Sequence, residues 1–540
     1  MNDCATPFAP HARRRPVVRA GRPTQTGAVT ILAAVTMVLA LLFTGLALDT
    51  ARLWLAKREL QRTADMAALA SARYTGCGTT YSQAMQAAQN ALAQNKLTGA
   101  GITLRRGLAS RDLVSKHNTF TENNTEDSNA TQVMLTQTVP SSLLAGGLLD
   151  NSTTTLKASA TAKGGPPVAN FSIASFSSIS QSQANFITAL FKGILGNSSL
   201  NLGVAALADL GVTSVNLLQL QAAAGAATLD ELLNREVPIG QLFQWLATAS
   251  PSSTAASNAL SQLGSVSFNS GIKIRLRDVL DVQIPAPNAA ATVDINVLDL
   301  VQTSLLVGNG KGTINLGLNI AGVGGISLNV LNPPKIALGP AGKSLSGAWC
   351  TEAKSAQMSL KVGINPLGIG LVDMALYMDL LSTSGHLENL SISPGNNRGT
   401  MSVGSTLFSL RLRNNADTNL ASVLGGLMQV GLNLPLGQAT GGSAPFVVVS
   451  DADMPRNVQT SGVGGGTVAG LIGEDTSLII KILGLGIDFL APIVKGIISP
   501  ILTLIGEGII DPLLSALGID VGLVKVRLID IDAAKPVLII

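Results

Sequence analysis

Residues 28–48 form an apolar run of 21 positions without a charged side chain. A helix rises about 1.5 Å per residue, so this run spans about 30 Å, the thickness of the hydrocarbon core of a bilayer. Buried helices of soluble proteins seldom need an uncharged run of this length. The sequence therefore predicts one transmembrane helix near the start of the chain, with the membrane bilayer as its partner.

A group of basic residues precedes this run and sets its expected orientation. The group consists of Arg13, Arg14, Arg15, Arg19 and Arg22. Positively charged residues beside a membrane span remain on the cytoplasmic side. We therefore expect a single-pass protein of the inner (plasma) membrane, with its N-terminus in the cytoplasm and its body in the periplasm or another extracytoplasmic space.

A cleaved signal peptide is the competing interpretation. Gly45-Leu46-Ala47 loosely fits the rule of small residues around a peptidase cleavage site. However, the apolar run exceeds the roughly 7 to 15 residues of a signal peptide. Helical patterning also continues past the cleavage site, which favours a retained anchor.

Beyond Asp49, small and apolar residues recur at helical spacing, while charged residues fall on other faces. This pattern predicts one helix from residue 28 to about residue 73. Small side chains let helices approach closely in a membrane, so this face is a candidate packing surface for other proteins. Simple hydrophobicity explains the alanine content equally well. The expected helix-packing residues are Gly45, Ala47, Leu53, Leu60, Ala64 and Ala67.

The same region resembles the TadG-like proteins of Tad (Flp) pilus-assembly systems, which share a TadE/G-like N-terminal region. The resemblance lies in Gly27-Ala28-Val29, Gly45-Leu46-Ala47-Leu48-Asp49, Arg52-Leu53-Trp54, Lys57-Arg58-Glu59-Leu60-Gln61 and Ala64-Asp65-Met66-Ala67-Ala68-Leu69-Ala70. A weaker likeness continues from Thr131 to Ala162. It implies a membrane-anchored, non-enzymatic envelope protein that helps to assemble or anchor a pilus, with other Tad pilus-assembly proteins as partners.

Two features of such proteins are missing from the sequence. Type IV pilin subunits carry a Glu shortly after a processing glycine, but no acidic residue lies between Gly27 and Asp49. This absence argues against a fibre subunit. Many relatives also carry a von Willebrand A domain, whose metal site needs an Asp-x-Ser-x-Ser sequence. Asp451-x-Asp453 lacks those serines, so we interpret it as a turn.

The expected fold class is α+β: a single N-terminal transmembrane helix that continues into a long pilin-like helix, then an exported body with a helical subdomain and an antiparallel β-sheet. Composition shifts and Gly- and Pro-rich breaks predict six parts. They are a cytoplasmic basic tail (1–26), the transmembrane and long helix (27–75), a small α+β unit (76–163), a helical subdomain (168–260), a β-rich domain (266–460), and apolar helices with C-terminal strands packed on the body (468–540).

Periodicity predicts elements within these parts. Helical spacing or composition predicts helices near 80–95, 184–195, 201–209, 215–224, 229–235 and 239–248. Strand character predicts strands near 131–139, 153–162, 272–277, 292–297, 314–320, 358–362, 408–412, 523–531 and 536–540. Residues 468–518 are aliphatic but interrupted by charges, so we expect buried helices that cover the sheet, with membrane association as the alternative.

Charge and cysteine content exclude several function classes. The net charge of +4 resides wholly in residues 1–26, so the remaining chain is neutral and no nucleic-acid partner is expected. Cys4 would stay in the cytosol after export, which leaves Cys77 and Cys350 as a candidate disulfide. Two unrelated free thiols are the alternative interpretation.

Motifs for chemistry are weak throughout the chain. Gly342-Lys343-Ser344 lacks the first glycine of a phosphate-binding loop, because Ala337 stands there. Gly308, Gly310 and Gly312 follow a strand pattern and are interpreted as turn or bulge glycines. His386 lies in a Ser- and Gly-rich stretch that we read as a surface loop, far in sequence from any Cys. We expect no enzyme activity, no catalytic residue, no metal site and no cofactor.

The sequence therefore favours a membrane-anchored structural component of a pilus apparatus. A periplasmic module that binds an apolar ligand or a lipid, in a groove between the sheet and residues 468–518, is the first alternative. An adhesin-like module exposed through the pilus is the second.

Overall fold

The computed structural model describes most of the chain, and every structural statement below refers to the residues it describes. They are residues 26–97, 99–111, 118–142, 153–173, 179–250, 254–267, 270–282, 291–365, 372–393, 395–404, 406–417, 420–423, 428–433, 437–439, 442–450, 453–459, 478–482, 496, 500–516, 519–520 and 523–539.

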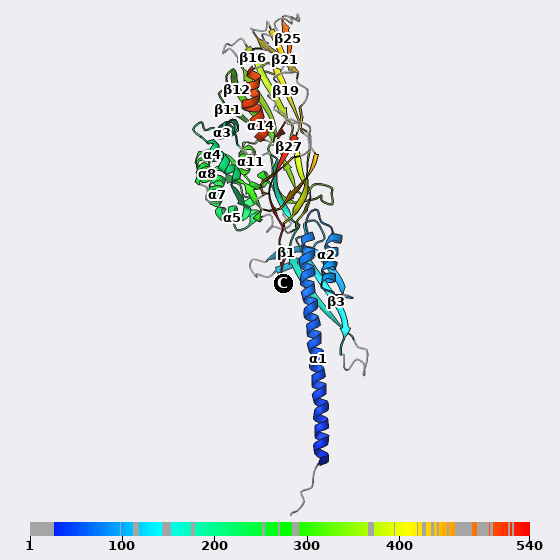
Figure 1. Ribbon diagram of the computed structural model, residues 1–540. Coiled ribbons are helices and arrows are strands. Elements are labelled where there is room, and N and C mark those ends of the chain that lie inside the picture. The colour runs from blue at the N-terminus through cyan, green and yellow to red at the C-terminus, as the bar shows by residue number, and fades with distance from the viewer. Residues whose placement is uncertain are drawn as a thin grey trace, which may run out of the picture. The chain divides into compact units, whose positions relative to one another are not determined.

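The first element is a single long helix, α1, from Thr26 to Ser71 (Figure 1). A short 3₁₀ turn, η1 (Ala72–Tyr74), follows it. The 46 residues of α1 rise about 70 Å at about 1.5 Å per residue. The helix passes without a break from the apolar run into the amphipathic stretch, which confirms the expectation of one helix from residue 28 to about residue 73.

The chain forms two compact units. The first contains residues 1–60 and 136–157, and the second contains residues 61–135 and 158–540. The helix α1 and the strands β3 (Ala130–Pro140) and β4 (Thr153–Lys163) contribute residues to both units.

A five-stranded sheet and the helix α2 (Tyr81–Gln94) follow α1 in the chain. The strand order is β2-β1-β3-β4-β28. The new strands are β1 (Gly101–Arg111), β2 (Asn118–Glu122) and β28 (Val537–Leu538). Because β28 pairs with β4, the end of the chain is built into the same sheet as residues that follow α1 directly.

The largest sheet has nine strands in the order β11-β12-β15-β16-β20-β21-β19-β22, with β25 paired to β21. Its members are β11 (Thr313–Leu316), β12 (Val323–Asn332), β15 (Gln357–Ile364), β16 (Val372–Leu380), β19 (Thr406–Arg413), β20 (Ala421–Val423), β21 (Met428–Asn433), β22 (Gly437–Ala439) and β25 (Leu478–Ile482). Each of its described pairings is antiparallel. Along β15 buried residues alternate with half-buried ones, so one face of the sheet meets the core and the other meets water.

Two further sheets have four strands or more, and two short two-stranded pairs, β6 (Ser214–Asn216) with β10 (Asp294–Asn296) and β7 (Val237–Pro238) with β8 (Lys273–Ile274), lie beside the helices. Of the two larger sheets, one has the order β24-β27-β5-β13-β9, with β26 beside β27, and the other has the order β14-β17-β18-β23. Their strands are β5 (Val168–Ile173), β9 (Leu280–Val282), β13 (Ile336–Pro340), β14 (Glu352–Lys354), β17 (Ser384–Ser391), β18 (Asn397–Val403), β23 (Gly442–Val448), β24 (Arg456–Gln459), β26 (Ile519–Asp520) and β27 (Leu523–Asp532). The central strand β5 is buried along its whole length.

Short helices pack together in a group beside the strands (Figure 1). They are α3 (Gln181–Leu195), α4 (Val204–Val212), α5 (Leu217–Ala224), α6 (Leu229–Asn234), α7 (Ile239–Ala249), α8 (Thr254–Ser267), α9 (Leu276–Val279) and α11 (Val297–Asn309). Side chains at their N-termini bond the free backbone N–H groups, as at Ser180 and Asn216. One continuous hydrophobic core joins these helices to the strands, with Phe171, Phe186 and Phe243 fully buried in it.

The fold confirms an α+β protein with one N-terminal helix long and apolar enough to cross a membrane. Helices α2 to α7 and strands β3, β4, β11, β15, β19 and β27 lie where periodicity predicts them. The Thr228 hydroxyl caps the N-terminus of α6, since it accepts the Glu231 N–H at 3.1 Å. No observation tests the six predicted part boundaries, which stay predictions.

Two expected strands are present but shorter than predicted. The strand near 272–277 is only the two residues of β8 (Lys273–Ile274), and the turn of α9 follows. The strand near 292–297 ends at Asn296, where α11 begins. The Asn296 side chain accepts the Asp299 N–H at 3.1 Å, and this cap starts the helix where apolar alternation alone suggested a strand.

Two single-residue expectations change as a result. The interpretation as turn glycines is wrong for Gly308, which lies inside α11, and is confirmed for Gly310, which forms the turn at the end of this helix with a φ of 60°. His386 belongs to β17 instead of a loop, and its ring stacks on Trp349 with centroids 4.7 Å apart.

Residues 468–518 are only partly helical. Residues 478–482 form the strand β25, because a β-branched run pairs in register with β21 and extends the sheet. Residues 500–505, the π-helical turn η4 (Gly506–Ile510) and α14 (Asp511–Ala516) form a helical segment. Its large apolar side chains are buried except Leu504, which is exposed. The expectation of buried helices therefore holds only for the second half. Residues 483–495 lie outside the described part.

Buried carboxylates near the C-terminal strand β27 make stability depend on pH. The Asp530 carboxylate accepts the Asp294 and Ile531 N–H groups at 2.8 Å each. Burial, together with the negative charges of Asp294 and Asp532, raises the pKa of Asp530 to about 6. Burial also raises the pKa of Asp299 to about 6, although Arg527 and a Ser172 hydrogen bond oppose the shift.

We expect the protein to lose stability as pH rises from about 4 to 7. The folded state holds these protons more tightly than the unfolded chain, so their stabilising contribution is present below the unfolded pKa and is lost through the folded pKa of about 6. Asp530→Asn should flatten the fall in the free energy of unfolding with pH, by about 1 kcal/mol at pH 7.5 after allowance for solvent screening. Unfolding curves recorded at a series of pH values measure this change. Exposed Asp127→Asn is the control. An unchanged pH profile in the Asp530 variant would contradict the assignment.

Candidate functional site

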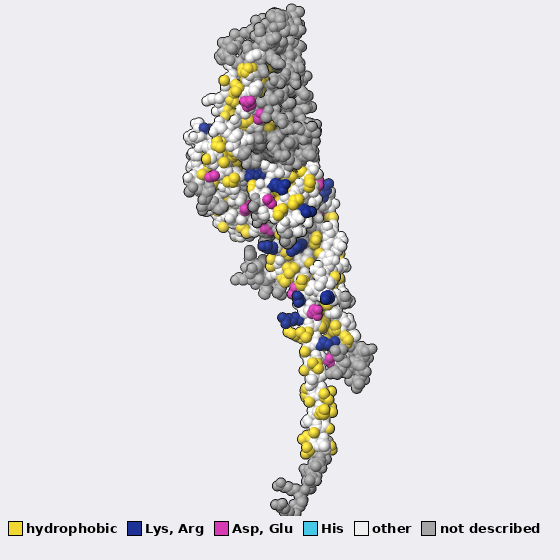
Figure 2. All heavy atoms as spheres, in the orientation of Figure 1, with side chains coloured by type: hydrophobic (Ala, Val, Ile, Leu, Met, Phe, Trp, Pro, Cys, Tyr) yellow, Lys and Arg dark blue, Asp and Glu magenta, His cyan; other side chains and the backbone are white. Residues whose placement is uncertain are grey.

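The first half of α1 exposes apolar side chains that the described rest of the chain does not cover. Figure 2 shows hydrophobic side chains along its exposed length. In the most hydrophobic 18-residue window, mean hydropathy is 2.5 and only 6% of the residues are buried. The exposed large apolar residues of this segment are Val29, Ile31, Leu32, Val35, Met37, Val38, Leu39, Leu41, Leu42, Phe43, Leu46 and Leu48. Water-soluble surfaces rarely carry such a patch, which indicates a single-pass membrane anchor.

Hydroxyl groups within this apolar segment are satisfied by the helix itself. The Thr36 hydroxyl donates to the Ala33 carbonyl at 3.0 Å, and the Thr44 hydroxyl donates to the Ala40 carbonyl at 2.7 Å. The Thr50 hydroxyl bonds back to Leu46 in the same way at 2.7 Å. Because polar groups without partners are costly in hydrocarbon, these bonds make the threonines compatible with a bilayer.

A polar and aromatic collar begins where the apolar run ends. Trp54 is 59% exposed, and the Arg58 guanidinium lies 5.5 Å from the centre of its ring. The Arg52 guanidinium donates to the Pro140 carbonyl, and the Lys57 ammonium donates to the Lys157 carbonyl. Tryptophan and basic residues gather at the membrane–water interface. We call Asp49, Arg52, Trp54, Lys57 and Arg58 the collar; it lies at the level expected for that interface.

The collar also connects α1 to the ends of two strands within the same unit. The Ser142 hydroxyl donates to the Asp49 carboxylate just past the end of β3. Arg52 and Lys57 bond carbonyls in or next to β3 and β4, as described above. The first polar turns after the apolar run are thus held by this protein's own backbone.

The predicted packing face divides into two parts. Ala47 is exposed and Leu53 is half-buried, so these two leave a surface open on the described chain, whereas Gly45 is buried within α1. Leu60, Ala64 and Ala67 are instead 0% exposed. The expectation that this second part offers a surface to partner proteins is wrong for Leu60, Ala64 and Ala67.

In the second unit, the last turns of α1 pack on the five-stranded sheet. The hydroxyls of Ser71 and Thr131 are 2.8 Å apart, and Thr131 also donates to the Ala68 carbonyl at 3.2 Å. The Gln61 amide donates to the Ser159 carbonyl at 2.9 Å. Alanine side chains on this face let the strands approach the helix backbone closely enough for these bonds. The small residues that suggested a partner interface therefore build the protein's own core.

A disulfide joins Cys77 and Cys350, with their Cα atoms 5.7 Å apart. The turn beside it needs glycine. Gly78 has a φ of 76°, and a Cβ there would lie 2.4 Å from the Ala341 carbonyl oxygen. Cys350 N–H donates to the Gly342 carbonyl at 3.0 Å. The bond therefore crosslinks the turn after α1 to the segment 341–350, across 273 positions of sequence.

The described residues give little support for a catalytic site at Ser384 and His386. The Ser384 hydroxyl lies 3.1 Å from His386 Nε2, but His386 Nδ1 is buried without a hydrogen-bond partner. Burial lowers the pKa of His386. No described residue therefore orients the ring as a triad acid would. Among the described residues, no group of three or more His, Cys, Asp or Glu is placed to hold a metal ion.

The five arginines of the basic tail lie outside the described residues. Asp453 takes the place expected of a turn residue, because its carboxylate accepts the Val449 and Ser450 N–H groups at 2.9 and 3.0 Å. Sequence reasoning missed the role of Trp54 and Arg58 as a collar. The signal was present, since an exposed Trp beside basic residues directly after an apolar run is typical of an interface.

Comparison with protein families matches the N-terminal quarter of the chain. Residues 27–73 match the Flp pilus-assembly TadE/G-like family. Residues 70–162 match the Tad-like Flp pilus-assembly family, which covers the end of α1, α2 and the strands β1 to β4. No curated protein and no solved structure matches the chain. The matches confirm the resemblance and support a Tad pilus-assembly protein.

Removal of the disulfide should destabilise the protein without unfolding it. A crosslink across 273 positions restricts the unfolded chain strongly, so Cys77→Ser with Cys350→Ser should lower the free energy of unfolding by about 3 to 5 kcal/mol. Thermal or urea unfolding of the purified protein measures this loss. Cys4→Ser is the matched control and should unfold like the parent. Equal stability of all three proteins, with no mobility change upon reduction in electrophoresis, would refute the crosslink.

Proposed function

We propose, on the premise that residues 27–162 carry the two Tad pilus-assembly matches, that this chain is a non-enzymatic, membrane-anchored component of a Tad (Flp) pilus apparatus. Residues 1–26 would lie in the cytoplasm, and the residues after α1's apolar segment would lie in the periplasm. The role is mechanical: α1 holds the chain in the inner membrane, and the body serves assembly or anchoring of the pilus.

The bare first half of α1 carries this proposal. A helix that is 6% buried in its apolar window needs a second apolar medium, and the bilayer is the medium that its length fits. The collar supports the assignment of one end of this segment to the interface. The disulfide supports an oxidising compartment for the body.

The continuity of α1 favours a retained anchor. Gly45, Leu46 and Ala47 lie inside the helix, and the Leu46 carbonyl accepts the Thr50 hydroxyl. A signal peptidase needs extended backbone at its cleavage site, so these bonds would first have to break.

The lipid-binding alternative needs a groove between the sheet and residues 468–518, and the contacts of residues 500–516 count against one there. The helix after residue 500 packs directly on the loop around Gly322, where an added Cβ would lie 3.1 Å from Ile501. Gly508 approaches Ile320 equally closely, with 3.0 Å from an added Cβ. This segment therefore fills the space next to the sheet, in the place where a groove for an apolar ligand was expected.

A topology fusion tests the orientation. Alkaline phosphatase joined after Lys163 should be active, because the enzyme needs the oxidising periplasm to form its disulfides. A fusion after Arg22 is the control and should be inactive. Replacement of Arg13, Arg14, Arg15, Arg19 and Arg22 by Ser should lower the activity of the Lys163 fusion, since the positive charge that fixes the orientation is lost. An inactive fusion after Lys163 in the unaltered protein would overturn the assignment.

A second test concerns the surface that α1 leaves open. Gly45→Leu with Ala47→Leu should reduce surface pili several-fold, because large side chains keep partner helices apart. Pili sheared from cells are quantified against the amount of this protein in the membrane. Leu41→Ile, on the same apolar segment, is the control and should leave piliation unchanged. Normal piliation in the double variant would exclude packing through this face.

A further inference from the structure

A shallow groove lies on the water-facing side of the nine-stranded sheet. Its volume is about 410 Å³. Its floor contains Gly325 of β12 and Gly363 of β15, which are paired across the two strands. An added Cβ at Gly325 would meet no atom within 4 Å, so the groove exists because this position has no side chain. We call this site the glycine groove.

Polar side chains line the glycine groove. They are Asn315, Ser327, Lys361, Asn365 and Asn415. The first three form one row across the sheet, because Asn315 pairs with Ser327 and Ser327 pairs with Lys361. Directly paired residues share a face, so their side chains stand on the same side of the sheet. Amides and hydroxyls both donate and accept hydrogen bonds, which matches a ligand rich in hydroxyl groups.

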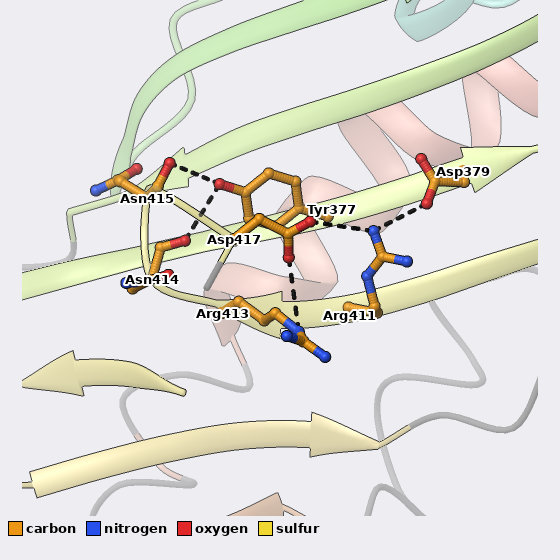
Figure 3. Close-up of polar contacts among 7 residues, drawn as sticks. All are labelled: Tyr377, Asp379, Arg411, Arg413, Asn414, Asn415 and Asp417. Carbon is orange, nitrogen blue, oxygen red and sulfur yellow. Dashed lines mark hydrogen bonds and ion pairs between the residues drawn. The ribbon is translucent and has the colours of Figure 1, made fainter. Parts of the chain in front are cut away.

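One wall of the groove is fixed by a network at its end (Figure 3). The Tyr377 hydroxyl bonds the Asn414 and Asn415 carbonyls, at 3.1 and 2.7 Å. Arg411 contacts the carboxylates of Asp379 and Asp417 at 2.9 and 3.3 Å. This network holds the loop 414–417 in place. The Asn415 Oδ1 atom then lies over the floor, 3.8 Å from a Cβ added at Gly363.

The charge of the groove comes from Lys361. Its ammonium donates to the Asn415 carbonyl at 2.7 Å and lies 5.8 Å from the centre of the Tyr377 ring. None of the ion pairs among the described residues includes Lys361, whereas Arg411 and Arg413 both face carboxylates. No acidic residue lines the groove. The site therefore offers a positive charge that no carboxylate of the described residues pairs with, beside neutral hydrogen-bonding groups.

We propose that the glycine groove binds an acidic polysaccharide, with a uronic acid residue over the glycine floor and its carboxylate against Lys361. The amides of Asn315 and Asn415 and the Ser327 hydroxyl then bond sugar hydroxyls. A floor without side chains lets a sugar ring lie against the sheet, and polar groups that converge on the groove orient the sugar. This proposal is independent of the pilus assignment, because it rests on the sheet alone.

Binding of polygalacturonate to the full-length protein in detergent tests the proposal. Gly325→Gln adds a side chain in the groove, its Cβ meets no atom within 4 Å, and binding should weaken about tenfold or more. Lys361→Met should weaken it about tenfold through loss of the charged hydrogen bond, and Lys361→Arg should retain most of it. Gly203→Gln, at another open glycine that lies on the helical part, is the matched control and should bind like the parent.

The basic tail attracts any polyanion, but it is identical in all of these variants. Differences among them therefore report on the groove. Neutral dextran and poly-glutamate should bind much more weakly than polygalacturonate, since the first lacks the carboxylate and the second lacks the hydroxyl groups. Equal binding of poly-glutamate, or polygalacturonate binding that survives both Gly325→Gln and Lys361→Met, would overturn the proposal.

Discussion

The structure depends on the difference in burial between the two ends of the helix α1. The first half of α1 exposes its apolar side chains, while the last turns bury Ala64, Ala67 and Ala68 completely. The change occurs within one continuous stretch of hydrogen-bonded backbone. A helix that is fixed to a folded sheet at one end cannot retract its apolar end into the core. The apolar segment therefore needs an apolar environment outside the core, and a membrane supplies one. The attachment of α1 to the small sheet thus creates the need for a membrane.

Small residues in a helix have two explanations that sequence alone does not separate. Alanines at helical spacing permit close approach by a helix from another protein or by strands of the same chain. Here the hydroxyls of Ser71 and Thr131 meet across such a contact. The strands involved begin about 60 positions later in the chain, and no local pattern in α1 announces them. Only Ala47 and Leu53 are left for partners from the predicted packing set.

Elements with a strong hydrophobic period could be predicted from the sequence. Residues at which a helix cap competes with that period could not. The apolar run and the helices of the first 250 residues follow from spacing and caps. At residues 292–297, however, alternation predicted a strand that is present only at Asp294–Asn296, because the Asn296 cap starts α11 at the next residue. The paired cysteines were predictable from the compartment. The glycine groove depends on residues brought together by strand pairing, such as Ser327 and Lys361, which lie far apart in the sequence.

The neutrality of the chain after residue 26 explains why one lysine can matter. Charges after residue 26 balance, and several of those on the sheet pair locally, as Arg411 does with Asp379. Long-range attraction of a polyanion to such a surface is weak, because the fields of balanced charges cancel at a distance and salt at about 0.1 M screens what remains beyond about 10 Å. Recognition must then come from contact. A cation without a carboxylate partner, placed beside a floor that lacks side chains, provides the contact geometry that a balanced surface otherwise lacks.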